Sequence, residues 1–120
     1  MNDDDISSLI RLAHSTRLSL KKPSQSYFRV VSIISYEDFD GNVVNLFGAN
    51  IESVFIGGSI CAERAALCKL RMAHNVKSVL SILIVSDALF PLSPGLLCRE
   101  FLSSYLDRKV PVIMSGSRIT

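Results

Sequence analysis

Two cysteines and one glutamate carry the chemistry that this sequence could perform. Cys61 and Cys98 each follow a loop marked by glycine or proline, and each is predicted in the first turn of a helix. The positive end of a helix favours the thiolate, which is the form of cysteine that binds metals or attacks carbon. Glu63 comes two residues after Cys61, close enough to serve whatever Cys61 holds. Spacing alone leaves a second reading open, in which the cysteines are buried and simply pack.

The elements that must position these residues alternate between helices and strands. Apolar spacing predicts one helix that begins near Asp3–Asp5 and reaches about Leu20, and two more over 61–74 and 93–105. Runs of β-branched or continuous apolar residues predict strands over 28–36, 43–47, 79–85 and 110–114, with a hairpin turn at 40–42 and a loop over 48–59. This order indicates a single α/β domain over residues 1–120 with a mixed sheet.

The helix over 61–74 is apolar around most of its circumference. Its charged and polar side chains share a narrow stripe, which consists of Glu63, Arg64, Arg71 and His74. A helix of this kind is expected to be buried on more than one side, by its own sheet and by another subunit. The pattern therefore predicts a homo-oligomer.

Composition excludes several classes of protein. The chain has 120 residues, 48% of them apolar, and its mean hydropathy is +0.34, so it can bury a core and is not disordered. A net charge of +2 gives little attraction for nucleic acid or a membrane surface, and no apolar run is long enough to span a bilayer. Three cysteines without a secretory signal predict reduced thiols and a cytoplasmic protein.

Residues 48–64 resemble the signature of the cytidine deaminases. The positions that match are Gly48, Asn50, Glu52, Gly57, Ile60, Cys61, Ala62, Glu63 and Arg64. The second motif of that family resembles the segment from Ser93 to Glu100, which contains Gly95 and Cys98. The likeness reaches from the first helix to Met114 and implies the family's fold, a three-layer α/β/α arrangement with a mixed central sheet.

The resemblance also implies a site and a reaction. In that family three thiolates hold a zinc ion, and a glutamate moves protons during hydrolytic deamination of cytidine. By resemblance Cys61 and Cys98 are zinc ligands, Glu63 is the proton shuttle and Arg64 hydrogen-bonds the sulfurs. The implied substrate-binding residues are Phe28, Asn50, Glu52 and Ala62. The family's small members are homotetramers that act on free pyrimidine nucleosides and not on nucleic acid.

Gly95 departs from the family pattern, because it stands at the position of one zinc-ligand cysteine. We expect two thiolates to bind zinc more weakly than three, and no other residue is an obvious substitute. Ser93 and Asp87 are conceivable third ligands, whereas nothing in the pattern brings His14 to the site. Two functions therefore stay open: a zinc-dependent deaminase of cytidine or deoxycytidine, and a catalytically silent paralogue that binds nucleosides or acts as a regulatory or structural subunit.

Overall fold

A computed structural model describes residues 2–22, 29–50, 61–88 and 110–116 of the chain. Its elements are α1 (Asp3–Ser19), β1 (Val30–Asp38), β2 (Val43–Ala49), α2 (Ala62–Met72), β3 (Val76–Ser86) and β4 (Val112–Ser115). The helix expected over 93–105 lies outside the described residues.

The strands form one sheet in the order β2-β1-β3-β4. β1 runs antiparallel to both β2 and β3, whereas β3 and β4 are parallel, so the sheet is mixed as the sequence predicts. With these directions, β1 begins at the same edge of the sheet where β2, β3 and β4 end. We call this the functional edge, because the candidate residues described below gather there.

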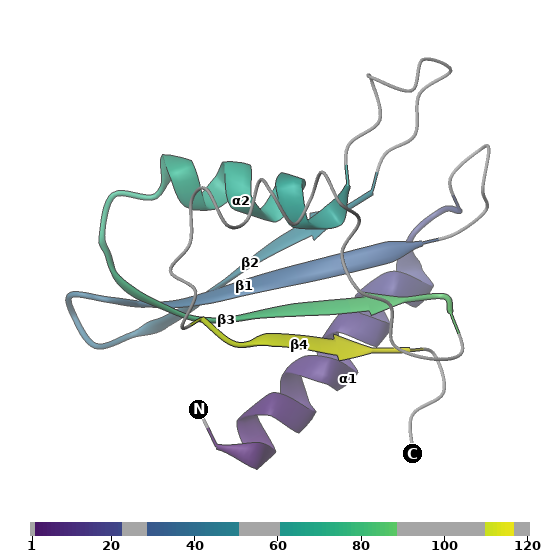
Figure 1. The fold of residues 1–120 in the computed structure, drawn as a ribbon, viewed down its shortest axis with the longest axis horizontal. Coiled ribbons are helices and arrows are strands. Elements are labelled where there is room, and N and C mark those ends of the chain that lie inside the picture. The colour runs from purple at the N-terminus through teal and green to yellow at the C-terminus, as the bar shows by residue number, and fades with distance from the viewer. Residues whose placement is uncertain (1, 23–28, 51–60, 89–109, 117–120) are drawn as a thin grey trace.

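Among the described residues, α2 covers one face of the sheet and α1 the other (Figure 1). On the α2 side, Ala66 and Leu67 pack against Ile34, Ile82 and Ile84. On the α1 side a second core cluster contains Ala13, Val31, Ile33, Leu83 and Val85. Adjacent strand residues point to opposite faces, so each strand contributes to both clusters. This arrangement confirms the predicted α/β/α layers.

Local sequence signals account for the start of α1 and for the hairpin. Asn2 caps α1: its side chain accepts the Asp5 backbone N–H, and the Asp5 carboxylate accepts the Asn2 N–H in return. In the hairpin, Gly41 has a φ of +84°, a conformation that glycine adopts without steric cost. The Asp38 carboxylate accepts backbone N–H groups from Asp40 and Asn42 and closes the turn.

Gly48 lies in β2 and not in the loop that the sequence predicts from this residue onward. It is buried where β2 passes under the first turn of α2. A Cβ atom at Gly48 would lie 2.3 Å from the Ala62 carbonyl oxygen and 2.4 Å from the Ala66 backbone nitrogen. Glycine therefore allows this close approach of strand and helix.

The boundaries of the other strands differ from the expected ones by a few residues. β3 is longer than predicted, beginning at Val76 rather than 79, because Lys77 and Ser78 lie at the polar end of the ladder beside Glu37. β1 begins and ends two residues later than expected. Such shifts arise where pairing with a neighbour, rather than apolar content, decides the end of a strand.

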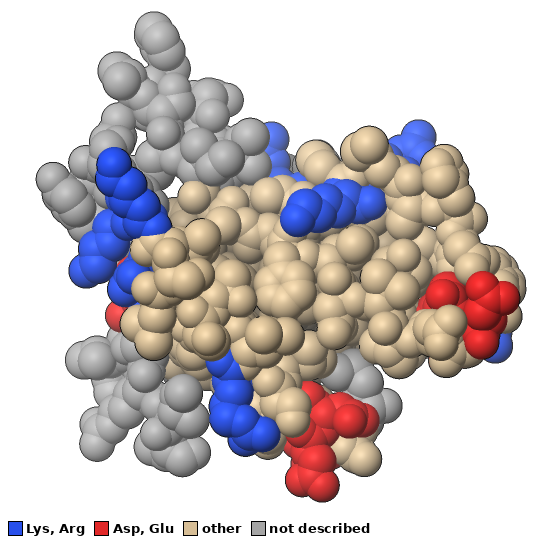
Figure 2. Space-filling model, turned by 180° about the vertical axis from the view of Figure 1, so that it is seen from behind, with Lys and Arg blue, Asp and Glu red and all other residues tan. Residues whose placement is uncertain are grey.

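Charged side chains stand in separate groups on the face opposite to that of Figure 1 (Figure 2). Wide uncharged areas lie between the basic side chains, which do not form a continuous strip on this face. None of the helices in the described ranges is long and apolar enough to cross a membrane.

Candidate active site

The first turn of α2 holds two of the candidate residues. Cys61 is the N-cap of the helix, and its sulfur accepts the backbone N–H of Arg64 at 3.4 Å. Ala62 is fully buried under this turn, against Gly48 of β2. The sulfur of Cys61 therefore lies at the positive end of the helix dipole, where negative charge is stabilised.

Glu63 is buried, with only 4% of its surface exposed. This corrects the sequence interpretation, which placed Glu63 with Arg64, Arg71 and His74 on the polar stripe of the helix. Removal from water raises the pKa of the Glu63 carboxyl above its usual value, and a hydrogen bond to its own backbone amide opposes the rise only in part. A carboxyl whose pKa is raised by burial holds its proton more readily than an exposed one, which suits a proton carrier in catalysis.

Asn50 lies at the functional edge, directly after β2. Its Oδ1 accepts the backbone N–H of Val30 at 2.9 Å, and its own N–H donates to the Val30 carbonyl oxygen at 3.2 Å. The Asn50 side chain thus ends the β1–β2 ladder and holds the first residue of β1 in place by a hydrogen bond. This contact employs the amide oxygen, whereas the resemblance assigns Asn50 to a ribose hydroxyl.

Four of the sequence candidates lie outside the described residues. They are Phe28, Glu52, Gly95 and Cys98. Their roles stay predictions. The described part of the site consists of the first turn of α2, with Cys61, Ala62, Glu63 and Arg64, and of Asn50 at the end of β2.

Asp87, considered above as a third metal ligand, is bound elsewhere. Directly after β3, its carboxylate accepts hydrogen bonds from the guanidinium groups of Arg29 and Arg17 and from the Arg29 backbone N–H. Burial disfavours the charged form, but the hydrogen bonds from Arg29 and Arg17 outweigh it and lower the pKa of Asp87 to about 2. A carboxylate held by two cations in this way does not serve as the missing ligand.

Sequence reasoning missed the cluster around Asp87 because its members are far apart in the chain. Arg17 and Asp87 are separated by 70 residues. His14 also belongs to this cluster, with Nδ1 accepting from Arg17 Nε at 3.2 Å. The one available signal was the spacing of His14 and Arg17, which are three residues apart and so share one face of a helix.

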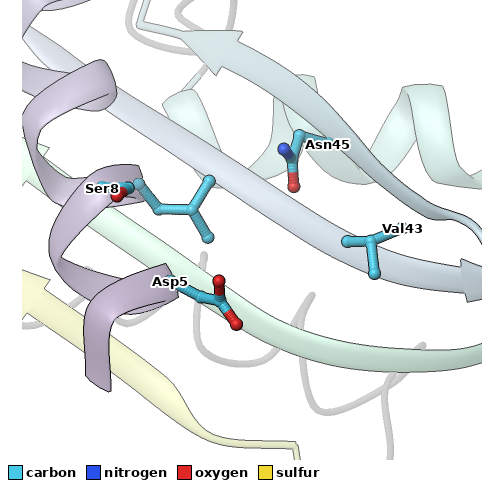
Figure 3. Close-up of a pocket in the computed structure, with 5 residues that line it drawn as sticks. Asp5, Ser8, Val43 and Asn45 are labelled. Atoms are coloured by element: carbon cyan, nitrogen blue, oxygen red, sulfur yellow. The ribbon is translucent and has the colours of Figure 1, made fainter. Parts of the chain in front are cut away.

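A cavity of about 220 Å³ opens away from the functional edge, between the first turns of α1 and the beginning of β2 (Figure 3). Its lining is Asp5, Ser8, Leu9, Val43 and Asn45. The Asp5 carboxylate is already engaged in the helix cap, and Asn45 Oδ1 accepts from the Ser35 hydroxyl at 2.7 Å. None of the candidate residues of the active site lines it.

Comparison with known proteins relates this arrangement to one group of enzymes. No protein-family model matches the chain. The chain is 30% identical over 77 residues to the cytidine deaminase of Sporosarcina psychrophila, which is 64% of this chain and 54% of that protein. It is 38% identical over 64 residues to the cytidine deaminase of Halalkalibacterium halodurans, or 53% of this chain and 46% of that protein. The match thus spans about half the length of these curated relatives.

Solved structures extend the likeness to the fold. The crystal structure of cytidine deaminase from Burkholderia pseudomallei superposes with a TM-score of 0.76 and 24% identity, covering 98% of this chain and 87% of that one. Cytidine deaminase from Mycobacterium tuberculosis superposes with a TM-score of 0.63 and 25% identity, covering 83% and 76%. The chain thus resembles cytidine deaminases in sequence over 64% of its length, and in fold. Its mixed sheet between two helical layers is the cytidine deaminase fold.

Similarity to cytidine deaminases implies a zinc ion. The first turn of α2 carries side chains of the type that a zinc site requires. It offers one sulfur at a helix N-terminus and a buried carboxyl two residues further on. Within the described ranges, no three His, Cys, Asp or Glu side chains converge on one point. The described residues thus provide one candidate ligand, Cys61, and one candidate proton carrier, Glu63.

Cys68, exposed on α2, is a free thiol, in line with the reduced thiols expected from the sequence. Since the thiolate is the metal-binding form of cysteine, a ligand role for Cys61 requires its reduced state.

Proposed function

We propose that this protein hydrolyses free cytidine or deoxycytidine to uridine or deoxyuridine and ammonia. The observation that carries the proposal is Glu63, a buried carboxyl with a raised pKa, two residues after a cysteine at a helix N-terminus. Homology to cytidine deaminases supports the same reaction.

Zinc held by Cys61 and Cys98 would supply an activated water beside Glu63. Glu63 would take one proton from the attacking water as its oxygen adds to C4, and would deliver that proton to N3 of the cytosine ring. The same carboxyl would then carry the remaining proton of the new C4 hydroxyl to the exocyclic amine, so that the C4–N4 bond breaks, ammonia leaves and the C4 carbonyl forms. The burial that raises the pKa of Glu63 favours its protonated form, which suits a carboxyl that accepts a proton and then returns it.

The proposed nucleoside contacts surround the same turn. Asn50 and Glu52 bind the ribose hydroxyls, Phe28 packs beside the pyrimidine and Ala62 lies beneath it, while Arg64 donates to the ligand sulfurs. Because Asn50 Oδ1 is engaged with Val30 N–H, the Asn50 amide donor is the group proposed to face the ribose. The proposal includes a homotetramer, in which the exposed Cys68 and Met72 of α2 meet a neighbouring subunit.

Gly95 favours a second candidate function, that of a catalytically silent, nucleoside-binding paralogue. A chain without the third thiolate keeps the fold and the nucleoside contacts but binds zinc weakly. The two functions differ in one measurable property, which is turnover of cytidine by reduced, zinc-supplied protein.

The decisive experiment compares wild type, Glu63→Gln and Glu37→Gln, each reduced and supplied with zinc. Cytidine loss is followed by ultraviolet absorbance. Glu63→Gln keeps the shape of the side chain but cannot carry the proton, so kcat should fall by about 10²–10⁴-fold. Glu37 is partly exposed on β1 beside Lys77, and its substitution should leave the rate unchanged.

Stability separates a catalytic effect from unfolding. The folded-state pKa of Glu63 is raised, so its contribution to stability is lost as pH rises above its usual value of 4.5. Glu63→Gln should therefore be at least as stable as wild type at pH 7. Cytidine binding without turnover in wild type would favour the silent paralogue, and the absence of both would refute a nucleoside site.

A further inference from the structure

A largely buried group of charged side chains joins α1 to the start of β1 and the end of β3. Arg17 lies on the buried face of α1, and its Nη1 donates to Oδ1 of Asp87. Arg29, directly before β1, donates to the same carboxylate from Nε and Nη2 at 3.0 Å each, and from its backbone N–H at 2.7 Å. The exposed fraction of the side chain is 8% for Arg17, 14% for Arg29 and 13% for Asp87. We call this group the arginine clamp.

His14 extends the arginine clamp to the end of β4. Its Nδ1 accepts from Arg17 Nε, and its Nε2 lies 3.1 Å from the hydroxyl of Ser115, which in turn donates to the Gly116 carbonyl oxygen. A neutral imidazole with its hydrogen on Nε2 satisfies both contacts. A protonated ring would instead turn an N–H toward the N–H of Arg17. His14 thus fixes the orientation of Arg17 only while it is neutral.

Other charged groups near His14 also disfavour its protonation or leave it unaffected. On its own helix Arg17 contributes a positive charge, and Asp87 after β3 is neutralised by Arg17 and Arg29. β4 contributes only the uncharged Ser115, while a backbone hydrogen bond to Gly116, directly after β4, favours the protonated ring and opposes the shift in part. Burial and the Arg17 charge lower the pKa of His14 below its usual value of 6.5.

The arginine clamp sits at the functional edge. Asp87 N–H donates to the Arg29 carbonyl oxygen at 3.0 Å, so these two residues extend the β1–β3 pairing by one step beyond Val30 and Ser86. From here the chain continues into 23–28 on one side and 89–109 on the other, the segments that contain Phe28 and Cys98. The positions of Arg29 and Asp87 therefore set where both segments leave the sheet.

At the opposite end of the same two strands the charged contact is exposed. There Lys77 and Glu37 form an ion pair of 3.4 Å whose side chains are 57% and 34% exposed. Exposed pairs of this kind contribute little to stability, whereas a carboxylate bound by several charge-assisted donors away from water is rigidly fixed. The exposed Lys77–Glu37 pair at one end of the β1–β3 pair is therefore a control for the arginine clamp at the other end.

We propose that Arg17, oriented by neutral His14, is a positioning residue that acts through Asp87 to fix the two strand ends flanking the nucleoside site. The inference rests on the proposed function for its effect on cytidine. The fixing of the strand ends is a separate property that can be measured without substrate.

The first test measures amide hydrogen exchange in wild type, Arg17→Lys and Lys77→Gln. Lysine keeps the charge of Arg17 but cannot donate to both His14 and Asp87 in the planar geometry of a guanidinium. We expect exchange at the Arg29 and Asp87 amides to rise about tenfold in Arg17→Lys, with the hairpin at Asp40 unchanged. Lys77→Gln breaks an ion pair between the same strands and should leave Arg29 and Asp87 protected. Unchanged exchange in Arg17→Lys would overturn the proposal whatever the activity.

The second test measures the dissociation constant of cytidine by calorimetry between pH 5 and 8. Arg17→Lys should weaken binding about tenfold or more. In wild type binding should weaken as His14 becomes protonated, whereas His14→Gln, which can still accept from Arg17 but does not titrate, should bind independently of His14 protonation. Wild-type affinity in Arg17→Lys despite faster exchange would make the clamp merely structural and overturn its positioning role. If wild type binds no cytidine, the proposed function fails, and the exchange comparison alone decides whether Arg17 fixes the strand ends.

Discussion

Gly48→Ala tests how closely α2 must approach β2 for the candidate site to form. The added Cβ would meet two backbone atoms of α2, the Ala62 oxygen at 2.3 Å and the Ala66 nitrogen at 2.4 Å. No side-chain rotation can relieve such a contact. The first turn of α2 must therefore recede by about 1 Å to restore ordinary van der Waals distances, and in a close-packed core this opens gaps beside Leu67 and Ile34.

The expected cost of Gly48→Ala is about 2–3 kcal/mol, typical of overpacking in a core that cannot relax freely. For a chain of this size that corresponds to a fall in Tm of roughly 10 °C. Ala62 is adjacent to both Cys61 and Glu63. If the proposed function is correct, the displacement should also lower kcat/KM by about 10²-fold, since 1 Å errors in catalytic geometry have effects of that order.

Gly41→Ala provides the matched control. Gly41 has a φ of +84° but no atom within 4 Å of its Cβ position, so the substitution adds backbone strain without a steric contact. We expect a loss of roughly 1 kcal/mol and no change in cytidine binding, because the hairpin lies at the opposite edge of the sheet. Both variants are compared by urea unfolding and by calorimetric titration with cytidine. A Gly48→Ala protein as stable as wild type would refute the close contact between β2 and α2.

Two further predictions concern metal and pH. Gly95→Cys should raise the zinc content per chain of reduced protein, measured by metal analysis, because a third thiolate joins Cys61 and Cys98; no rise over wild type would show that the alignment of this segment with the metal site is wrong. The free energy of unfolding should fall below about pH 6.5, because the unfolded chain binds a proton at His14 more readily than the folded chain does. It should fall again between pH 3.8 and about 2, where Asp87 becomes protonated. Thermal unfolding across pH checks this, and the loss of stability that begins below pH 6.5 should be absent in His14→Gln.

The layers of the fold could be predicted because each depends on signals short in sequence. Acidic residues before Ile6 predicted the start of α1, Gly41 predicted the hairpin turn, and the apolar run within β3 predicted a central strand. The onset of α2 at Cys61 followed from the change from a glycine-rich stretch to an apolar helical pattern. Patterns of this kind act over a few residues and do not require knowledge of contacts across the chain.

The environment of individual polar residues could not be predicted in the same way. Glu63 was assigned to the narrow polar stripe of its helix together with charged residues, but tertiary packing buries it. Asp87 was considered for metal binding because nothing local indicates that Arg17, 70 residues earlier, lies against it. In both cases the burial and the partner of the side chain come from contacts between distant segments, which periodicity does not encode.

The start of β1 shows how positioning at the functional edge is achieved. Here the regular ladder stops, and two consecutive backbone N–H groups bind side chains instead of strands: Arg29 N–H donates to the Asp87 carboxylate, and Val30 N–H donates to Asn50 Oδ1. The acceptors belong to the two neighbours of β1, so its first residues are held from both sides. Because a shift of one residue would reverse which face each β1 side chain occupies, these contacts also fix the register where the candidate site begins. Loss of cytidine binding in Asn50→Ala would therefore combine a lost nucleoside contact with a loosened strand, and only a variant that keeps the oxygen acceptor, such as Asn50→Asp, separates the two.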